Sequence, residues 1–467
     1  MSIGSKFEDL KKNQEKIPYP SAQRRIDLLI SLRKGLQEQA ILFANAISND
    51  FSHRSREETL AIEVFFTLRT INFCIKNTKK WMKKRKRKIS WLFRSAYAYL
   101  LPQPLGVVGI MVPWNFPLYL ALVPAAYAIS AGNRIMIKVS ELTPNTGKAL
   151  IHLIKSAKLE DYIHVVDGDI ETAKIFTNLP FGHLLFTGST QVGKKVMEAA
   201  SRNLTPVTLE LGGKSPAIVS KTVSSAYFNR LFMGKLLNAG QTCVAPDYLF
   251  IPEGWEEKIE QTFRAFMNKH YPQLESNSDY TAIVSESHKK RLQKLIEDAQ
   301  QKGARVICFG DHNLKGQKLP VYLVFNVHQD MLIMQQEVFG PIFPIMSYQS
   351  FNQVIQYINS HPCPLSLYYF GQNKEEKEQL LLKTLSGGFI VNNTIMQTGI
   401  DDLPFGGVGA SGMGTYHGRE GFDVFSKLKS VFVQRRIALL SYLYPPYGKL
   451  LTFFLKKIGK INFKSNL

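Results

Sequence analysis

Cys243 is the cysteine of this chain whose neighbours best suit a nucleophile. It lies in NAGQTCVAPDY, among small and polar residues and after a segment with a helical pattern, whereas Cys308 lies in the apolar run RVICF. A thiol with an ordinary pKa of about 8.5 becomes reactive when a nearby positive charge or dipole lowers that pKa. The surroundings of Cys243 therefore indicate a candidate nucleophile. Structural filler is the alternative when the residue is judged alone.

A carboxylate and an amide could assist such a nucleophile. Glu210 lies inside the apolar stretch VTLELGGKSPAIV, where burial would raise its pKa toward the range of a general base. An alternating strand with Glu210 facing solvent is the competing interpretation. Asn115 lies in VPWNFPLYL, between a predicted buried strand and a predicted helix. Its amide could donate to an oxyanion, or the residue could cap the helix, which is the commoner role.

Two glycine-rich stretches compete for a phosphate group. FTGSTQVGKK follows the strand-like run HLLF and opens a helix, so Gly188 and Ser189 would lie at a helix N-terminus that faces a pyrophosphate. The stretch nearly matches GxxxxGK[ST], but Lys195 stands where a Mg²⁺-binding hydroxyl is needed, which argues against nucleoside-triphosphate hydrolysis. Residues 407–412 read GVGASG without a preceding strand, and we interpret them as a loop.

The elements predicted around these residues are those of an α/β protein. Residues 20–80 have the period of amphipathic helices. Between 105 and 220, apolar runs such as GVVGIMV and RIMIKV alternate with helical segments, which is typical of a parallel sheet with crossover helices. Thr143 followed by Pro144 predicts one helix start, with a hydroxyl cap. A second α/β pattern runs from about 230 to 400, so we expect two α/β domains, a cleft between them and a terminal arm.

Composition excludes several classes of protein. The chain has 467 residues, 45% of them hydrophobic and 20% charged, which is ordinary for a globular protein with two or three domains. Its start is polar and unlike a secretory signal, and no apolar run is long enough to span a membrane. Four cysteines form neither a disulfide framework nor a metal-ligand cluster, so we expect no metal and a reducing, cytoplasmic location.

The formal net charge of +21 is concentrated in two places. Lys79 to Lys88 reads KKWMKKRKRK, and the tail after Val431 is again basic. No nucleic-acid-binding motif accompanies these residues, so we expect no nucleic-acid partner and interpret them as a solvated or lipid-facing surface. On a helix, Lys449 to Lys460 would place leucines and phenylalanines on one side and lysines on the other. Such a helix could lie on an anionic membrane, or it could dock on the protein's own body or a dimer partner.

Taken together and in this order, the motifs resemble those of the aldehyde dehydrogenase superfamily across nearly the whole chain. They are PWNFP, KVSE, FTGSTxxG, LELGGKSP, GQTC, EVFGP, and LPFGG with SGMG. GQTCVAPDY and SGMGTYHG look like the class 3 branch, and WMKKRKRK and DDLPFGG look like the bacterial coniferyl-aldehyde dehydrogenases. The resemblance implies a Rossmann-like NAD(P)-binding domain at 1–209 with a bridging hairpin near 90–105, an α/β catalytic domain at 210–400, and a C-terminal loop, arm and basic tail at 401–467. It also implies a homodimer.

The resemblance implies NAD(P)-dependent oxidation of an aldehyde to the carboxylic acid, with NAD as cofactor and NADP as an alternative. Cys243 would attack the aldehyde, Asn115 and the Cys243 backbone amide would stabilise the oxyanion, and Glu210 would activate the water that hydrolyses the thioester. The matching cofactor-binding residues are Trp114, Lys138, Glu141, Gly188, Ser189, Gly193, Glu337 and Phe339. Lys138 would bind the adenosine ribose, and Glu141 would disfavour the 2′-phosphate of NADP by charge repulsion.

The chain departs from the family pattern at two positions, of which the first leaves the matched Glu337 in place and the second weakens the substrate assignment. Gln336 precedes Glu337 where the family usually has two glutamates, and Gln397 stands where relatives often carry histidine. The substrate is expected to be an aromatic aldehyde of the coniferyl type or a long-chain aliphatic aldehyde. A relative that transfers the acyl group to coenzyme A is one alternative, although such proteins typically lack the glutamate matched by Glu210. A catalytically idle membrane-surface protein on the same fold is another.

Overall fold

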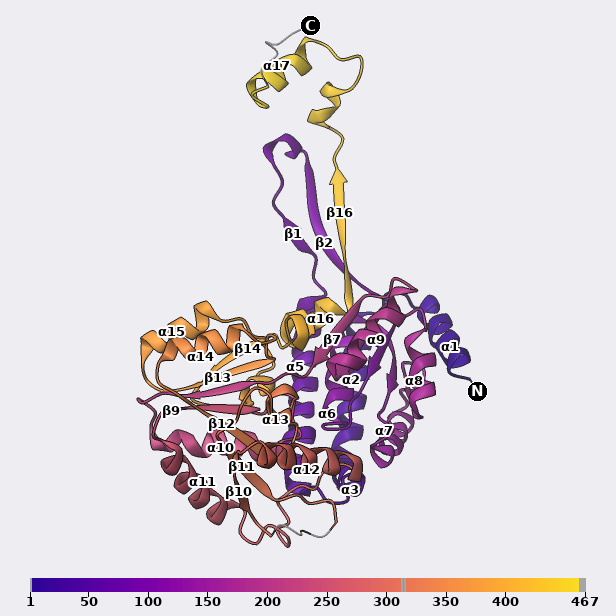
Figure 1. The fold of residues 1–467 in the computed structure, drawn as a ribbon. Helices are drawn as coiled ribbons and strands as arrows, with labels where there is room; N and C mark the ends of the chain where they lie inside the picture. The colour runs from indigo at the N-terminus through magenta and orange to yellow at the C-terminus, as the bar shows by residue number, and fades with distance from the viewer. Residues whose placement is uncertain (1, 312–313, 315, 462–467) are drawn as a thin grey trace.

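The computed structural model describes residues 2–311, 314 and 316–461, and within them the strands form three sheets (Figure 1). The longer helices are α1 (Ile3–Lys16), α2 (Ala22–Glu38), α3 (Ala40–Asp50), α5 (Phe65–Trp81), α6 (Tyr119–Ala131), α7 (Pro144–Ser156), α8 (Ile170–Thr177), α9 (Thr190–Ser201), α10 (Phe228–Leu236), α11 (Glu256–His270), α12 (Glu286–Gln301), α14 (Phe351–Asn359), α15 (Lys374–Lys383) and α17 (Lys449–Lys457). The shorter ones are α4 (Arg56–Glu58), which continues into the π-helical segment Thr59–Val64, α13 (Leu332–Gln335) and α16 (Gly418–Val424). 3₁₀ turns lie at Trp91–Phe93, Ser225–Tyr227, Leu237–Gly240, Met396–Gly399, Gly409–Ser411 and Leu439–Leu443.

The first sheet has six strands in the order β15–β7–β6–β3–β4–β5. Its strands are β3 (Val107–Met111), β4 (Arg134–Lys138), β5 (Ile163–Val166), β6 (His183–Gly188), β7 (Val207–Leu211) and β15 (Gly412–Met413). All neighbours are parallel except β15, which is antiparallel to β7. The chain passes from β3 to β4 and β5 on one side and then to β6 and β7 on the other. The strand order therefore switches between β3 and β6, and open α/β sheets bind ligands at the carboxyl ends of strands beside such a switch.

The apolar segment after β3 forms α6, which is buried along its length. Residues 120–131 are all buried, as their apolar sequence predicts for a helix inside the core. The helix ends at Gly132, whose φ of 91° favours glycine over residues with a Cβ. Among the described residues, no helix combines the length and the apolar character that crossing a membrane requires.

The second sheet has seven strands in the order β10–β11–β12–β9–β8–β13–β14. Its strands are β8 (Pro216–Val219), β9 (Tyr248–Pro252), β10 (Arg305–Phe309), β11 (Val321–Phe325), β12 (Ile342–Tyr348), β13 (Ser366–Phe370) and β14 (Gly388–Val391). Only the pair β10–β11 is antiparallel. Each large sheet has its own apolar core. The expected α/β class with parallel sheets is therefore confirmed.

A three-stranded antiparallel sheet projects from the body as an arm (Figure 1). It consists of β1 (Arg85–Arg87), β2 (Ala96–Pro104) and β16 (Ser426–Gln434), and β2 pairs with β16 from Pro104↔Ser426 to Ala96↔Gln434. The turn Trp91–Phe93 and helix α17 lie at its far end, away from both large sheets (Figure 1). The tail helix ends at Lys457 rather than at the predicted Lys460, which has a left-handed φ of 49°.

The predicted hydroxyl cap at Thr143 is wrong. The Thr143 side chain makes no capping hydrogen bond, although Pro144 does open α7. Asp50, the last residue of α3, supplies the cap instead: its carboxylate accepts from the backbone N–H groups of Asn145 and Thr146, each at 2.9 Å. A carboxylate is the stronger acceptor and also interacts favourably with the positive end of the helix dipole. The capping residue lies far away in sequence, so local pattern could not reveal it.

Candidate active site

Cys243 lies between two cavities and forms part of the wall of each. The first, the apolar cavity, is lined by Ile62, Phe66, Phe116, Tyr119, Leu120, Leu237, Thr242, Cys243, Val244, Ile395, Met396, Thr398, Gly399, Phe405, Tyr416 and His417. The second, the strand-end cavity, is lined by Pro113, Trp114, Asn115, Thr187, Gly188, Ser189, Glu210, Leu211, Gly212, Cys243, His288, Arg291, Glu337 and Phe339. Residues 113–115, 187–189 and 210–212 of its wall lie at the carboxyl ends of β3, β6 and β7, where the switch in strand order predicts a ligand site.

A strained turn carries Cys243 to this position. Asn238, Ala239 and Gly240 have φ values of 52°, 50° and 75°, so three successive residues adopt left-handed backbone. A Cβ at Gly240 would lie 2.4 Å from the carbonyl oxygen of Gly340, so this position requires glycine. Residues held in such conformations cost about 1–3 kcal/mol each and persist where the surrounding structure fixes them. The surrounding contacts therefore hold the Cys243 loop firmly.

Glu210 lies within β7, between β6 and β15, where it pairs in register with Thr187 and Gly412. The residue is 3% exposed, so the competing interpretation of a solvent-facing position is wrong. Neither carboxylate oxygen has a hydrogen-bond partner among the described residues. Burial alone raises the pKa of Glu210 well above its usual value of 4.5. Burial therefore favours the protonated form of Glu210 over a wider pH range than in an exposed glutamate.

The expected lowering of the Cys243 pKa is not found. Burial, together with the carboxylates of Glu337 and Glu210, raises that pKa to about 12, while backbone hydrogen bonds oppose the shift. The sequence-based argument required a nearby positive charge, and none of these shifts comes from a cation of the chain. With its pKa raised in this way, the Cys243 side chain is a thiol near neutral pH.

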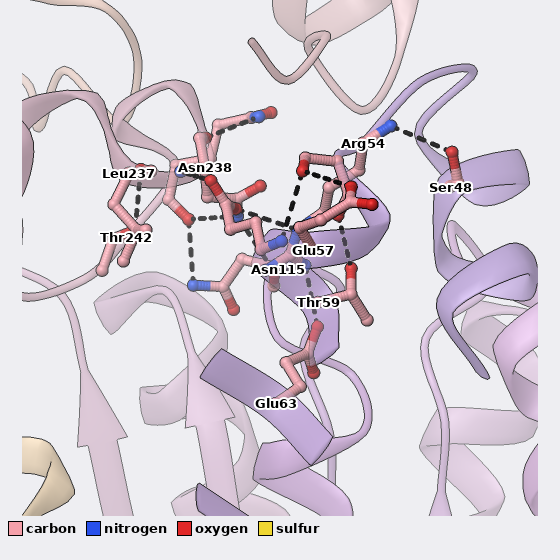
Figure 2. Close-up of polar contacts among 12 residues, drawn as sticks. Ser48, Arg54, Glu57, Thr59, Glu63, Asn115, Leu237, Asn238 and Thr242 are labelled. Carbon is pink, nitrogen blue, oxygen red and sulfur yellow. Dashed lines mark hydrogen bonds and ion pairs between the residues drawn. The ribbon is translucent and has the colours of Figure 1, made fainter. Parts of the chain in front are cut away.

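Asn115 follows β3 and does not cap α6. The Asn115 Nδ2 donates to the carbonyl oxygen of Gln241 at 3.1 Å, which leaves its second N–H for another acceptor (Figure 2). The backbone N–H groups of Leu118 and Tyr119, at the start of α6, donate to the Glu63 carboxylate at 2.9 and 3.1 Å. The helix-cap alternative for Asn115 is therefore wrong, because Glu63 takes that role.

Helix α9 presents its N-terminus to the strand-end cavity. Ser189 is its N-cap, with the hydroxyl accepting from the backbone N–H of Val192 at 3.4 Å. A Cβ at Gly188 would meet the Phe186 ring at 2.5 Å, and one at Gly193 would meet Leu211 at 2.6 Å. Gly193 therefore lets α9 approach β7 closely, and the missing side chain at Gly188 leaves room for the Phe186 ring of the same strand. Unpaired N–H groups and the helix dipole make this end suitable for a pyrophosphate, so the residues present fit a dinucleotide.

Lys138 and Glu141 lie at the same edge of the sheet but outside the wall of the strand-end cavity. Lys138 ends β4 beside Met111, and its Nζ donates to the carbonyl oxygens of Val139 and Gly168, both at 2.7 Å. Burial lowers its pKa, and Glu141 opposes that shift. Glu141 itself is exposed. Gly193, inside α9, is also absent from the cavity wall. The other eight predicted site residues all line it.

Glu337 and Phe339 are held by side chains that the sequence argument did not single out. Arg291 donates to the carbonyl oxygens of Glu337 and Val338 at 3.2 and 2.6 Å, and Asp247 accepts from the Val338 N–H at 2.7 Å. Partial burial raises the pKa of Glu337 to about 8. The Phe339 ring meets that of Trp114 edge-on at 5.4 Å. These two rings form one apolar corner of the cavity.

Sequence reasoning also missed His417, a polar group in the wall of the apolar cavity. The residue is 2% exposed, and neither ring nitrogen has a hydrogen-bond partner among the described residues. Burial lowers its pKa to about 3, so the ring is neutral and offers one donor and one acceptor. Gln397, by contrast, donates to Ser366 and Tyr368 and is not part of that wall. An isolated histidine in SGMGTYHG carried no signal of this position.

Comparison with known proteins identifies the family in which this arrangement occurs. The sequence profile described as "Aldehyde dehydrogenase family" matches residues 5–431. A probable coniferyl aldehyde dehydrogenase of Pseudomonas aeruginosa is 46% identical over 434 residues, which cover 92% of this chain and 91% of that protein. The chain belongs to the aldehyde dehydrogenase family.

Solved structures of aldehyde dehydrogenases share the fold. A substrate-bound Staphylococcus aureus AldH aligns with a TM-score of 0.92 and 36% identity over 97% of this chain and 99% of that one. The NAD+ complex of a Bacillus cereus aldehyde dehydrogenase aligns with a TM-score of 0.85 and 25% identity over 93% and 89%. The expected reaction and cofactor are confirmed: this aldehyde dehydrogenase oxidises an aldehyde to the acid with NAD, or with NADP as an alternative.

Proposed function

We propose that Cys243 is the nucleophile of the aldehyde oxidation, that Glu210 is the general base and that the Asn115 amide stabilises the oxyanion. The observation that supports these roles is the place of Cys243 in the walls of both cavities, with Glu210 and Asn115 beside it in the strand-end cavity. A thiol at that junction can meet an aldehyde from the apolar side and a cofactor from the other. A buried carboxylate at Glu210 favours water over coenzyme A as the acyl acceptor.

The proposed roles account for each bond change on the protein. The Cys243 thiol releases its proton to solvent, the resulting thiolate attacks the aldehyde carbon, and the oxyanion of the thiohemiacetal accepts hydrogen bonds from Asn115 Nδ2 and the Cys243 N–H. The dinucleotide, when bound, supplies the hydride acceptor, and an acyl thioester remains on Cys243. Glu210 then takes a proton from a water molecule that attacks the thioester carbon. The carbon–sulfur bond breaks, the acid leaves and the thiol is restored.

Replacing Cys243 by alanine tests the nucleophile. The variant should lose aldehyde oxidation and keep its affinity for NAD, because the thiol forms the covalent bond and contributes little to the cofactor contacts. Absorbance of NADH measures the first quantity and quenching of tryptophan fluorescence the second. Cys308→Ala is the matched control, since Cys308 lies on β10, far from both cavities in the fold. Turnover by Cys243→Ala at the rate of the unmodified protein would contradict the proposal.

The residues that would hold the dinucleotide follow from the cavity. We propose that the α9 N-terminus at Gly188 and Ser189 receives the pyrophosphate and that Glu337, Phe339 and Trp114 surround the nicotinamide ribose and ring. Lys138 and Glu141 would face the adenosine ribose at the end of β4. Binding there requires Lys138 to exchange one of its two carbonyl partners for a ribose hydroxyl, which keeps its number of hydrogen bonds constant.

We propose an aromatic aldehyde of the coniferyl type as the substrate. The wall of the apolar cavity carries several aromatic side chains, including Phe66, Phe116 and Phe405, and His417 is a polar group with free hydrogen-bonding capacity. A phenolic hydroxyl can use that capacity, whereas an alkyl chain cannot. The similar Pseudomonas aeruginosa protein is named a probable coniferyl aldehyde dehydrogenase. A panel of cinnamyl-type and long-chain aldehydes tests the assignment, and a higher kcat/KM for the long-chain members would overturn it.

We propose that residues 1–209 form the cofactor domain, 210–400 the catalytic domain and 401–467 the C-terminal loop, arm and tail, and that two copies form a dimer. Strand β14 is an edge of the seven-stranded sheet, and Leu382 at the end of α15 and Leu385 in the segment that leads into β14 are largely exposed. An apolar sheet edge of this kind is suited to pairing with a second copy. Sedimentation velocity should show a dimer that Leu382→Lys weakens. A monomer at every concentration would contradict the proposal.

The arm supports a further proposal, peripheral contact with an anionic membrane. Residues 82–104 and 426–461, which contain the arm and its tip, hold fifteen of the 58 Lys and Arg residues and none of the 37 Asp and Glu residues. These two segments therefore carry +15 of the net charge of +21. At the tip, Trp91 stacks on Phe454, while Leu450 and Phe453 of α17 are exposed beside Lys449 and Lys457. A cationic tip with exposed apolar side chains matches an anionic bilayer surface.

Sedimentation with vesicles tests the membrane contact. Each Lys or Arg near an anionic surface contributes ~1 kcal/mol, so the three lysines of α17 correspond to roughly 100-fold in affinity. Full-length protein should sediment with phosphatidylglycerol vesicles at low salt, less at high salt, and not with phosphatidylcholine vesicles. A chain truncated after Gln434 should remain in solution. Equal recovery of both chains in the supernatant at low salt would leave the tail as a dimer-packing element.

A further inference from the structure

A buried charge cluster contacts the Asn115 backbone (Figure 2). Arg54, in the loop between α3 and α4, is fully buried, and its guanidinium bonds to Glu58 at 3.2 Å and to Glu63 at 2.8 Å. The planar group also lies between the rings of Phe51 and Phe116, at 5.3 and 4.8 Å from their centroids. Taking three charged groups out of water carries a large desolvation penalty. The proposed mechanism gives this cluster no role.

The cluster contacts the backbone on both sides of the Asn115 side chain. Arg54 Nη1 donates to the carbonyl oxygen of Asn115 at 3.1 Å. The second oxygen of Glu63 accepts from Leu118 and Tyr119, and so fixes the start of α6. The short segment from Asn115 to Tyr119 is thereby held at both ends by the same arginine–glutamate pair. Figure 2 shows Arg54, Glu63 and Asn115 converging from separate segments.

The same cluster contacts the loop that carries Cys243. Glu58 accepts from the backbone N–H of Asn238 at 3.2 Å, and Asn238 Nδ2 donates to the Asn115 carbonyl at 3.0 Å and to the Gln241 carbonyl at 3.2 Å. The Gln241 carbonyl also accepts from Asn115 Nδ2. Asn238 is one of the three residues in left-handed backbone, so its position depends on such contacts.

We infer that Arg54, with Glu58 and Glu63, positions the two oxyanion donors relative to each other, the Asn115 amide and the Cys243 N–H. Arg54 acts through Asn115 and the Cys243 loop and is a positioning residue. The inference rests on the proposed role of Asn115. Guanidinium directs several N–H groups in fixed directions within one plane, whereas an ammonium group is a point charge without that geometry. Lysine at position 54 would therefore keep the charge and lose the alignment.

Arg54→Lys is the first test, and Arg25→Lys is its matched control. Arg25 is also buried and bonds to backbone carbonyls, of Pro20 and Ser130, but it touches neither cavity. Loss of a complete oxyanion donor lowers kcat by about 10²–10³-fold. Arg54→Lys leaves the Asn115 amide in the site but misaligns it. Both kcat and kcat/KM should therefore fall by about 10-fold or more, while KM and the Kd for NAD stay within about twofold of the values for the unmodified protein. Arg25→Lys should leave kcat within about twofold.

A double-mutant cycle separates positioning from general damage. If Arg54 acts through Asn115, Arg54→Lys should lower kcat far less in an Asn115→Ala background than in the unmodified protein. If Arg54→Lys does not fold, Glu58→Gln replaces it as the test variant. This isosteric change keeps Arg54 and should lower kcat without affecting the Kd for NAD. Equal fold losses in both backgrounds, or a kcat for Arg54→Lys equal to that of Arg25→Lys, would overturn the inference. Full activity of Asn115→Ala would instead refute the proposed oxyanion donor itself.

Discussion

Glu210→Gln should stabilise the folded protein, and by an amount that grows with pH. In the folded chain Glu210 is buried without a partner and its pKa is raised well above 4.5, whereas in the unfolded chain it ionises near that value. A raised folded pKa gives stability that is fully present below the unfolded pKa and is lost as the pH rises toward the folded one. Glutamine is neutral throughout. The advantage of the variant should therefore increase by ~1.4 kcal/mol per pH unit above about 4.5, until the folded pKa is reached.

Urea unfolding of the cofactor-free protein at pH 5.5, 6.5 and 7.5 measures this slope, and the variant should gain stability relative to the unmodified protein at each step that lies below the folded pKa of Glu210. Glu260→Gln is the control. Arg305 and Arg264 hold the pKa of Glu260 below its usual value, so Glu260 is ionised throughout this pH range and its ion pairs stabilise the fold by a constant amount. Removing the Glu260 charge should therefore destabilise the protein equally at each pH. A pH-independent difference for Glu210→Gln would show that the carboxylate is ionised when folded. The same variant should release a burst of NADH and then turn over slowly, since glutamine takes no proton from water.

Three other changes have defined outcomes. Glu141→Gln removes an exposed carboxylate beside the proposed ribose site, and kcat/KM for NADP should rise several-fold while that for NAD stays constant; equal effects on both would contradict the electrostatic explanation. His417→Phe should raise KM about 10-fold for a phenolic cinnamaldehyde, which corresponds to the loss of one hydrogen bond, and should leave KM for the analogue without the hydroxyl unchanged. Equal changes in KM for both aldehydes would show that the His417 ring only fills space. Asp50→Ala leaves the start of α7 without its cap and should lower the free energy of unfolding by about 1 kcal/mol or more. The melting temperature should fall while kcat stays unchanged, and an unchanged melting temperature would refute the cap.

The sequence predicted the elements better than it predicted the chemistry of the site. Alternating apolar runs located the parallel strands, and the Gly188–Ser189 pair located a helix N-terminus, because these signals are local and periodic. The apolar neighbours of Glu210 left both a buried and a solvent-facing position open, and the fold shows that it is buried. The pKa of Cys243 could not be predicted, since burial in the folded chain raises it and Glu337 and Glu210, which come from other segments, add to the shift.

Residues that act through long-range contacts left no signal in the sequence. Arg54 and Asp50 lie in a segment whose helical pattern is unremarkable, yet one supports the Asn115 backbone and the other caps α7. Arg291 lies on an amphipathic helix and supports Glu337. In each case the side chain serves a distant backbone group, and only the fold shows which group that is.

The pairing of β2 with β16 has a consequence for how the chain is made. The two strands pair over nine residues each, yet Pro104 and Ser426 are separated by more than three hundred residues. At about 5–20 residues per second of translation, β2 leaves the ribosome roughly 15–65 s before its partner strand. During that interval the edge of β2 that will pair with β16 has unpaired backbone N–H and C=O groups, which could pair with another nascent copy. The basic run Lys79 to Lys88 opposes this association, because like charges repel each other. The positive charge of the arm would thus protect the chain before it is complete.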